Sequence, residues 1–260
     1  MKRIAAALTA AVMMAALAGC GSSAQDKAGK QNTETQNADA RAEKPAGKTE
    51  QKEAEPEELQ VTDTGFVISS DGALLIGAEI KNPNKNYTLS HCNLDVTAQT
   101  ADGKSVTADE QNRTGLGTVL PDSTVYWAGM ISGNKNTADT DTVSVTPVYT
   151  SDCWIRTDTE ADRDLYTVSD VSVQYTDAGC LVISGKIALK DEQLLHSDVP
   201  DPAHPNLVCI LRDKEGKIVT GFSFRLPEAL EAGPFVSFSD RIWLHTDLDY
   251  ASADVYAYPG

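Results

Sequence analysis

Residues 72–81 read GALLIGAEIK, and residues 179–188 read GCLVISGKIA. We call the difference in numbering between Gly72 and Gly179 the first offset. At this offset the two stretches share a glycine, a leucine and two isoleucines: Gly72 and Gly179, Leu74 and Leu181, Ile76 and Ile183, Ile80 and Ile187. Apolar side chains two positions apart lie on one face of a β-strand. Each stretch therefore predicts a strand with its apolar face toward a core, and Glu79 falls on the opposite face of the first strand.

The match between the two copies extends in both directions. Val61-Thr62-Asp63 matches Val168-Ser169-Asp170 at the first offset. Farther along, Asn93-Leu94, Gly103-Lys104, Val106-Thr107 and Pro121 match Asn206-Leu207, Gly216-Lys217, Val219-Thr220 and Pro234 at a second, larger offset. The larger offset requires an insertion in the second copy, and the proline-rich stretch 197–205 has the composition of a loop that can hold it. The sequence thus predicts a duplicated unit with one enlarged loop.

The sequence pattern of each copy predicts an all-β sandwich. A second inward stripe is predicted at Leu94, Val96 and Ala98, and its counterpart at Leu207, Cys209 and Leu211. Asp102-Gly103 and Glu215-Gly216 predict hairpin turns, since a hairpin turn favours a residue that tolerates positive φ. A copy of about 90 residues has the size of an immunoglobulin-like domain. We expect two tandem immunoglobulin-like β-sandwich domains, at 59–149 and 166–260, joined by a linker at 150–165.

The predicted domains resemble a known family. The features that carry the resemblance are the run 80–87, the strand 94–100, the Asp102-Gly103 turn and the Leu120-Pro121 bend before residues 125–127. These look like the small immunoglobulin-like domains of bacterial lipoproteins, the FxLYD-type domain in particular. The resemblance covers 59–149 well and 166–260 loosely. It implies no catalytic residues.

The N-terminus predicts a secreted and lipid-anchored chain. Lys2 and Arg3 precede an apolar run from Ile4 to Leu17, which is too short to span a bilayer comfortably and is typical of a signal peptide. Leu17-Ala18-Gly19-Cys20 resembles the lipobox of bacterial lipoproteins. The resemblance implies a signal peptide at 1–20, cleavage before Cys20 and fatty acylation of that cysteine. Two acyl chains would give a stable membrane anchor. The alternative is an ordinary secretory signal with an incidental cysteine.

Residues 21–58 predict a disordered spacer. This stretch contains no Val, Ile, Leu, Met, Phe, Trp, Tyr or Cys, so it cannot bury enough apolar surface to offset the entropy of ordering. As a flexible coil, a stretch of this length spans roughly 35 Å. A spacer of this kind would hold the domains clear of the membrane surface.

Composition excludes several partners. The chain of 260 residues carries 22 Lys and Arg against 38 Asp and Glu, a net charge of −16. A chain this acidic is poorly suited to nucleic acid or to an anionic membrane surface. No Gly-x-Ser-x-Gly, His-Glu-x-x-His, phosphate-binding glycine loop or Cys-x-x-Cys motif is present. We therefore expect a protein that is not an enzyme and uses no cofactor.

Four cysteines besides Cys20 permit two disulfides in three pairings. A bridge between Cys153 and Cys180 would hold the linker against the second domain, while a buried free thiol is the alternative for Cys209.

Two other groups could bind metal. His196, Asp198, Asp201 and His204 lie together in the enlarged loop, although a solvated loop is the simpler interpretation. The alternating acids Asp158, Glu160, Asp162 and Asp164 are spaced like calcium ligands but lack the turn glycine and the final glutamate.

Three tryptophans could stack on sugar rings or partner side chains. Trp127 and Trp243 fall in predicted strands and are expected in the core, whereas Trp154 lies in the linker and is expected to be exposed or to pack at an interface.

These features predict a non-catalytic binding or presentation module on the outer face of the cell membrane, with a protein or an envelope polymer as partner. An accessory subunit of a transport or envelope-assembly complex is a second hypothesis, and an unrecognised extracellular hydrolase is a third.

Overall fold

The computed structural model describes residues 55–106, 113–133, 137–157, 165–176, 179–191, 201–226, 228–231, 233–244 and 248–260. The chain is all-β and its sheets are antiparallel, as predicted. Helical structure within these ranges is limited to two short 3-10 turns, η1 (Thr137–Asp139) and η2 (Ser151–Cys153). Backbone contacts join Glu53–Gly260 into one compact unit.

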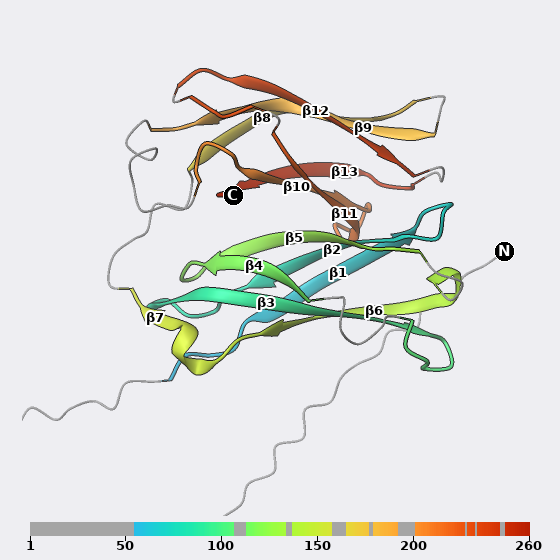
Figure 1. Ribbon diagram of the computed structural model, residues 1–260, viewed down its shortest axis with the longest axis horizontal. Helices are drawn as coiled ribbons and strands as arrows, with labels where there is room; N and C mark the ends of the chain where they lie inside the picture. Colours follow the sequence, from blue (N-terminus) through green and yellow to red (C-terminus); the bar gives the residue numbers. More distant parts are fainter. Residues whose placement is uncertain are drawn as a thin grey trace, which may run out of the picture. The chain divides into compact units, whose positions relative to one another are not determined.

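The first half of this unit contains two sheets (Figure 1). One has the strand order β1-β2-β5 and consists of β1 (Gln60–Ile68), β2 (Leu74–Lys81) and β5 (Thr124–Ile131). The other has the order β4-β3-β6 and consists of β4 (Arg113–Val119), β3 (Tyr87–Thr100) and β6 (Thr140–Val148), with the short β7 (Trp154–Arg156) also paired to β3. The predicted inward stripes Leu74, Ile76, Ala78, Ile80 and Leu94, Val96, Ala98 are all buried in the core between these sheets.

Apart from β7, the second half repeats this topology. One sheet has the order β12-β9-β8, from β8 (Tyr166–Tyr175), β9 (Cys180–Leu189) and β12 (Val236–Trp243). The other has the order β11-β10-β13, from β10 (Asn206–Arg212), β11 (Ile218–Arg225) and β13 (Ser252–Tyr258). The predicted stripes on β9 and β10 are buried together between the two sheets, at Leu181, Ile183, Ile187, Leu207, Cys209 and Leu211.

The turns repeat as well. In the first copy, Thr100 N–H donates to the carbonyl of Lys104 at 3.0 Å. Asp213 is the counterpart of Thr100 at the second offset, and its N–H donates to the carbonyl of Lys217 at 2.9 Å. Gly103 and Gly216, the glycines of these turns, both have φ of +79°. Such a φ favours glycine, so the predicted turns at Asp102-Gly103 and Glu215-Gly216 are confirmed with their physical reason.

The copies differ where prolines interrupt the second one. β3 has 14 residues and β10 has 7, because the first part of β3 pairs with β7. At the second offset this part corresponds to residues 200–205, which include Pro200, Pro202 and Pro205. Proline removes the backbone donor that a ladder needs, so the longer strand cannot form in the second copy.

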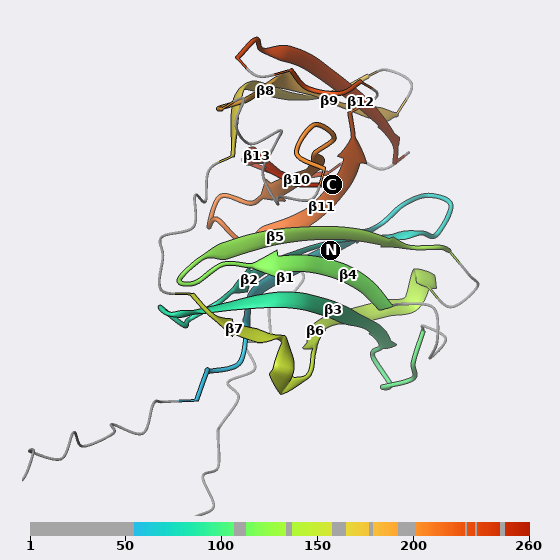
Figure 2. The ribbon, with the colours of Figure 1, turned by 60° about the vertical axis from the view of Figure 1, so that its left-hand side comes forward.

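Both β2 and β10 are buried on both faces, which the alternating pattern alone did not predict. Val208 and Ile210 on β10 form an apolar cluster with Ala128 on β5 and Ile218 on β11. Leu75 on β2 packs against the core of the second half. β11 therefore lies against the sheet of β1, β2 and β5, as Figure 2 shows. The continuous apolar runs 74–76 and 207–211 are typical of strands covered on both faces.

Glycine makes this close approach possible. A Cβ at Gly77 on β2 would stand 2.8 Å from the backbone nitrogen of Gly221 on β11, and a Cβ at Gly221 would stand 3.0 Å from the Cα of Gly77. Nearby, the Thr220 hydroxyl donates to the carbonyl of Leu75 at 2.7 Å. The two strands therefore meet backbone to backbone across the interface.

A polar cluster flanks the interface. The Arg212 guanidinium lies 3.1 Å from the Glu79 carboxylate and 5.3 Å from the centre of the Tyr126 ring. Burial acts to raise the pKa of Glu79, but hydrogen bonds from Thr62 and Arg212 outweigh it, so the pKa lies below its usual value. An ion pair with extra hydrogen bonds is the arrangement in which partial burial of charge is tolerated.

Candidate functional site

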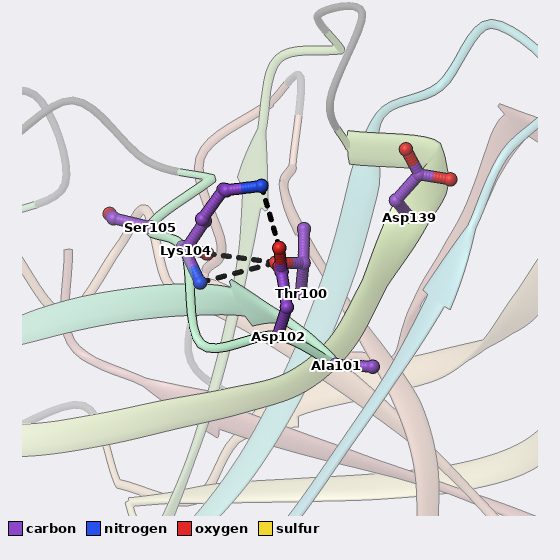
Figure 3. Close-up of a pocket in the computed structure, with 6 residues that line it drawn as sticks. All are labelled: Thr100, Ala101, Asp102, Lys104, Ser105 and Asp139. Atoms are coloured by element: carbon purple, nitrogen blue, oxygen red, sulfur yellow. Dashed lines mark hydrogen bonds and ion pairs between the residues drawn. The ribbon is translucent and has the colours of Figure 1, made fainter.

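A shallow depression of about 520 Å³ lies beside the hairpin that follows β3. Figure 3 shows its lining: Lys104 reaches back to Asp102, and Asp139 stands apart on η1. Lys104 Nζ lies 2.6 Å from Asp102 Oδ2, and this contact, with a hydrogen bond from the Thr100 hydroxyl, lowers the pKa of Asp102. Both charged side chains are exposed. These groups hydrogen-bond and pair within the turn itself, so the depression is a feature of the hairpin.

The enlarged loop is described only in part. His196 and Asp198 lie outside the described residues, as do the alternating acids from Asp158 to Asp164. His204 Nδ1 lies 2.8 Å from Asp201 Oδ1, with about half of each side chain exposed. Across the described ranges, no group of three or more His, Cys, Asp and Glu side chains is placed to hold a metal ion. The structure thus brings together two of the four predicted ligands.

The four described cysteines are free thiols. The predicted bridge between Cys153 and Cys180 is not made: Cys153 packs against the core of the first half, whereas Cys180 begins β9 in the second half. Cys209 is a buried free thiol, which was the alternative that the sequence left open for this residue.

The division of the three tryptophans between core and surface differs from the prediction. Trp127 is buried in the first core, as expected. Trp154 is half-buried and packs against the same core, edge-on to the Tyr149 ring at 5.6 Å. The expectation for Trp243 is wrong, because 58 % of this residue is exposed. Phe238 and Ile242 occupy the inward positions of β12, so Trp243, an odd number of positions from both, points to the opposite face.

Trp243 stands at one end of a set of outward-facing rows on the sheet β12-β9-β8. The strand register aligns Arg241 with Val182 and Gln174, and Ser239 with Ser184 and Ser172. We call these seven residues the Trp243 face: Trp243, Arg241, Ser239, Val182, Ser184, Gln174 and Ser172. The Gln174 side-chain amide donates to the Ser172 hydroxyl at 3.1 Å. The face ends at an exposed ion pair in which Lys186 Nζ lies 2.7 Å from Asp170.

Core side chains pack beneath the Trp243 face. Phe238 packs beneath it and lies 2.6 Å from where a Cβ of Gly185 would stand, so this glycine leaves the room that the ring occupies. Adjacent rows lie roughly 6.6 Å apart along a strand, and adjacent strands roughly 4.8 Å apart. The face therefore presents an exposed indole ring, a guanidinium, an amide and three hydroxyls at fixed spacings. Such groups can stack on an apolar ring face and hydrogen-bond the hydroxyls around it.

Sequence reasoning missed this face because it assigned Trp243 to the core from its place in a strand. The signal was present: Val236, Phe238 and Ile242 share one parity, and Ser237, Ser239, Arg241 and Trp243 share the other. Grouping with serine and arginine indicates the solvent side of a strand.

Comparison of the chain with protein-family models gave no match, and comparison with curated proteins gave none either. Within the described ranges, no helix is sufficiently long and apolar to span a membrane.

Proposed function

We propose that this chain is a bacterial lipoprotein anchored through Cys20 on the outer face of the cell membrane, and that it binds an envelope glycan, without catalysis, through the Trp243 face. The N-terminal sequence supports the anchor: a charged start, a short apolar run and a lipobox-like Leu17-Ala18-Gly19-Cys20. The polar stretch 21–58 supports a spacer between the lipid and the sandwich.

The exposure of Trp243 is the observation that carries the proposed binding activity. Trp243 is 58 % exposed on a sheet face, and tryptophan is among the residues enriched where proteins contact partners and ligands. Its neighbours decide the ligand class. The core of a protein interface is apolar, whereas the rows beside Trp243 carry serine, glutamine and arginine. A sugar ring has an apolar face bordered by hydroxyls, and this combination matches the Trp243 face.

The proposal is tested by co-sedimentation of the purified chain with insoluble cell-wall glycan, and by titration with soluble fragments of that glycan. Binding at Trp243 should change tryptophan fluorescence. Trp243→Ala should weaken binding roughly tenfold or more, as truncation of an aromatic hot-spot residue does in other interfaces. Met130→Ala is the matched control, because 65 % of Met130 is exposed on a different sheet.

Equal binding by the two variants would refute the assignment of the site, and failure of the unmodified chain to bind any envelope glycan would refute the ligand class. Crosslinking to a membrane protein in place of glycan would favour the accessory-subunit hypothesis.

A further inference from the structure

The chain returns to β3 in a way that places two cysteines side by side. β6 leaves β3 at Val148, which pairs with Asn93, and β7 returns with Trp154 paired to Leu89. Residues 149–153 therefore pass beside residues 90–92. The Ser90 hydroxyl donates to the carbonyl of Cys153 at 3.0 Å, so the backbone at Cys153 lies against the strand that carries Cys92.

Both cysteine side chains meet the same core. Cys92 is buried, and Cys153 is half-buried against the cluster to which Cys92 belongs. Burial raises the pKa of the Cys92 thiol to about 11, and a charge on Cys153 contributes to the increase. Such coupling is expected of two nearby sulfurs. The pKa effect is thus consistent with the backbone contact at Ser90.

The other two cysteines are placed apart from each other. Cys180 is buried at the start of β9, where it pairs with Trp243 of β12. Cys209 lies on β10, in the other sheet of the second half, and points into the core. Among the four cysteines, the described structure therefore favours Cys92 with Cys153 as a bonded pair and leaves Cys180 and Cys209 as separate thiols.

We propose that Cys92 and Cys153 form a disulfide when the protein meets a disulfide oxidant outside the cytoplasm. The half-buried Cys153 thiolate attacks the oxidant, which forms a mixed disulfide and releases one thiolate. Cys92 then loses its proton and attacks the Cys153 sulfur, which forms the Cys92–Cys153 bond and displaces the second thiolate. The two cysteines lose two electrons and two protons, and the oxidant becomes two thiols.

The bond would close a long loop of chain that includes β4, β5 and β6. It would fix η2 and β7 against the middle of β3, and it would restrict the unfolded chain over that loop. A disulfide of this kind raises the Tm by roughly 5–15 °C for a chain of this size.

The test uses the full chain in detergent, first reduced and then equilibrated with oxidised glutathione, with reduced chain as reference. Peptide mass spectrometry without reduction should find Cys92 linked to Cys153, and the Tm should rise. Cys153→Ser should abolish both the linkage and the rise. Cys180→Ser, the control, should retain both.

A bridge from Cys153 to Cys180 would overturn the proposal. So would a stable glutathione adduct on Cys153 with Cys92 still reduced, because it would show that the second sulfur is out of reach.

Discussion

The substitution Gly77→Ala tests the interface between the two halves most directly. The new Cβ would stand 2.8 Å from both the nitrogen of Gly221 and the carbonyl carbon of Thr220, which are backbone atoms that cannot rotate away. β2 and β11 would have to separate. Overpacking of this kind costs roughly 1–3 kcal/mol. Separation would also weaken the buried Thr220 hydrogen bond to Leu75, which is worth about 1 kcal/mol.

The summed loss corresponds to a Tm decrease of roughly 4–16 °C for a unit of about 200 residues. Thermal unfolding followed by circular dichroism measures it. Gly115→Ala on β4 is the matched control, because nothing lies within 4 Å of its added Cβ. This control also corrects for the reduced entropy of the unfolded chain, which is roughly 0.4–1 kcal/mol in favour of alanine. If Gly77→Ala unfolds at the same temperature as Gly115→Ala, the backbone contact between the halves is refuted.

Three further changes have defined outcomes. The pKa of Glu79 is lowered in the folded state, so its ion pair with Arg212 stabilises the fold above the usual pKa of 4.5 and is lost as the pH falls through the folded pKa. The wild-type chain should therefore have a higher Tm than Glu79→Gln at pH 7, and this difference should vanish in acid. A difference in Tm that stays constant with pH would contradict the argument. Asn82→Ala should lower the free energy of unfolding, measured in urea, by roughly 2–4 kcal/mol. The reason is that the buried Asn82 amide donates to three backbone carbonyls, which would lose their partner. An unchanged urea midpoint would contradict this. Cys20→Ala should move the protein from the membrane fraction to the soluble fraction, and undiminished membrane association would contradict the lipid anchor.

Much of the fold could be predicted because the decisive signals are local. Alternating apolar residues from Leu74 to Ile80 define the buried face of β2, and the turn at Gly103 needs only a residue that adopts positive φ. The two constant offsets then predict the same elements in the second copy. The burial of the other face of β2 is different in kind, because it depends on the approach of β11, which belongs to the other copy. The continuous run Leu74-Leu75-Ile76 was its only local sign.

The candidate site was less predictable for a similar reason. The parity of Trp243 with Ser239 and Arg241 is visible in one strand. Its neighbours Ser184 and Gln174, however, come from two other strands, and β8 changes register at a bulge between Ser169 and Ser172. The contact of Cys153 with β3 likewise depends on the path through η2. Neither the bulge in β8 nor the path through η2 can be predicted from the spacing of residues in the sequence.

The repeated strand order explains why the Trp243 face belongs to the second half alone. The sheet β12-β9-β8 corresponds to the sheet of β5, β2 and β1, so the same outward positions occur twice. In the first copy these positions on β2 are Leu75, Gly77 and Glu79, and residues of β10 and β11 pack against them. At the first offset their counterparts on β9 are Val182, Ser184 and Lys186, where side chains are half-exposed or exposed.

The residue at each of these positions follows from what covers it. Gly77 has no side chain where a backbone lies 2.8 Å from the position of its Cβ, whereas its counterpart Ser184 carries a hydroxyl and is half-buried. Glu79 turns to Arg212 across the interface, whereas Lys186 pairs with Asp170 of its own sheet. One copy of the surface therefore joins the halves, and the equivalent positions of the other copy stay half-exposed or exposed. The proposed ligand site thus rests on an asymmetry that the repeat itself creates.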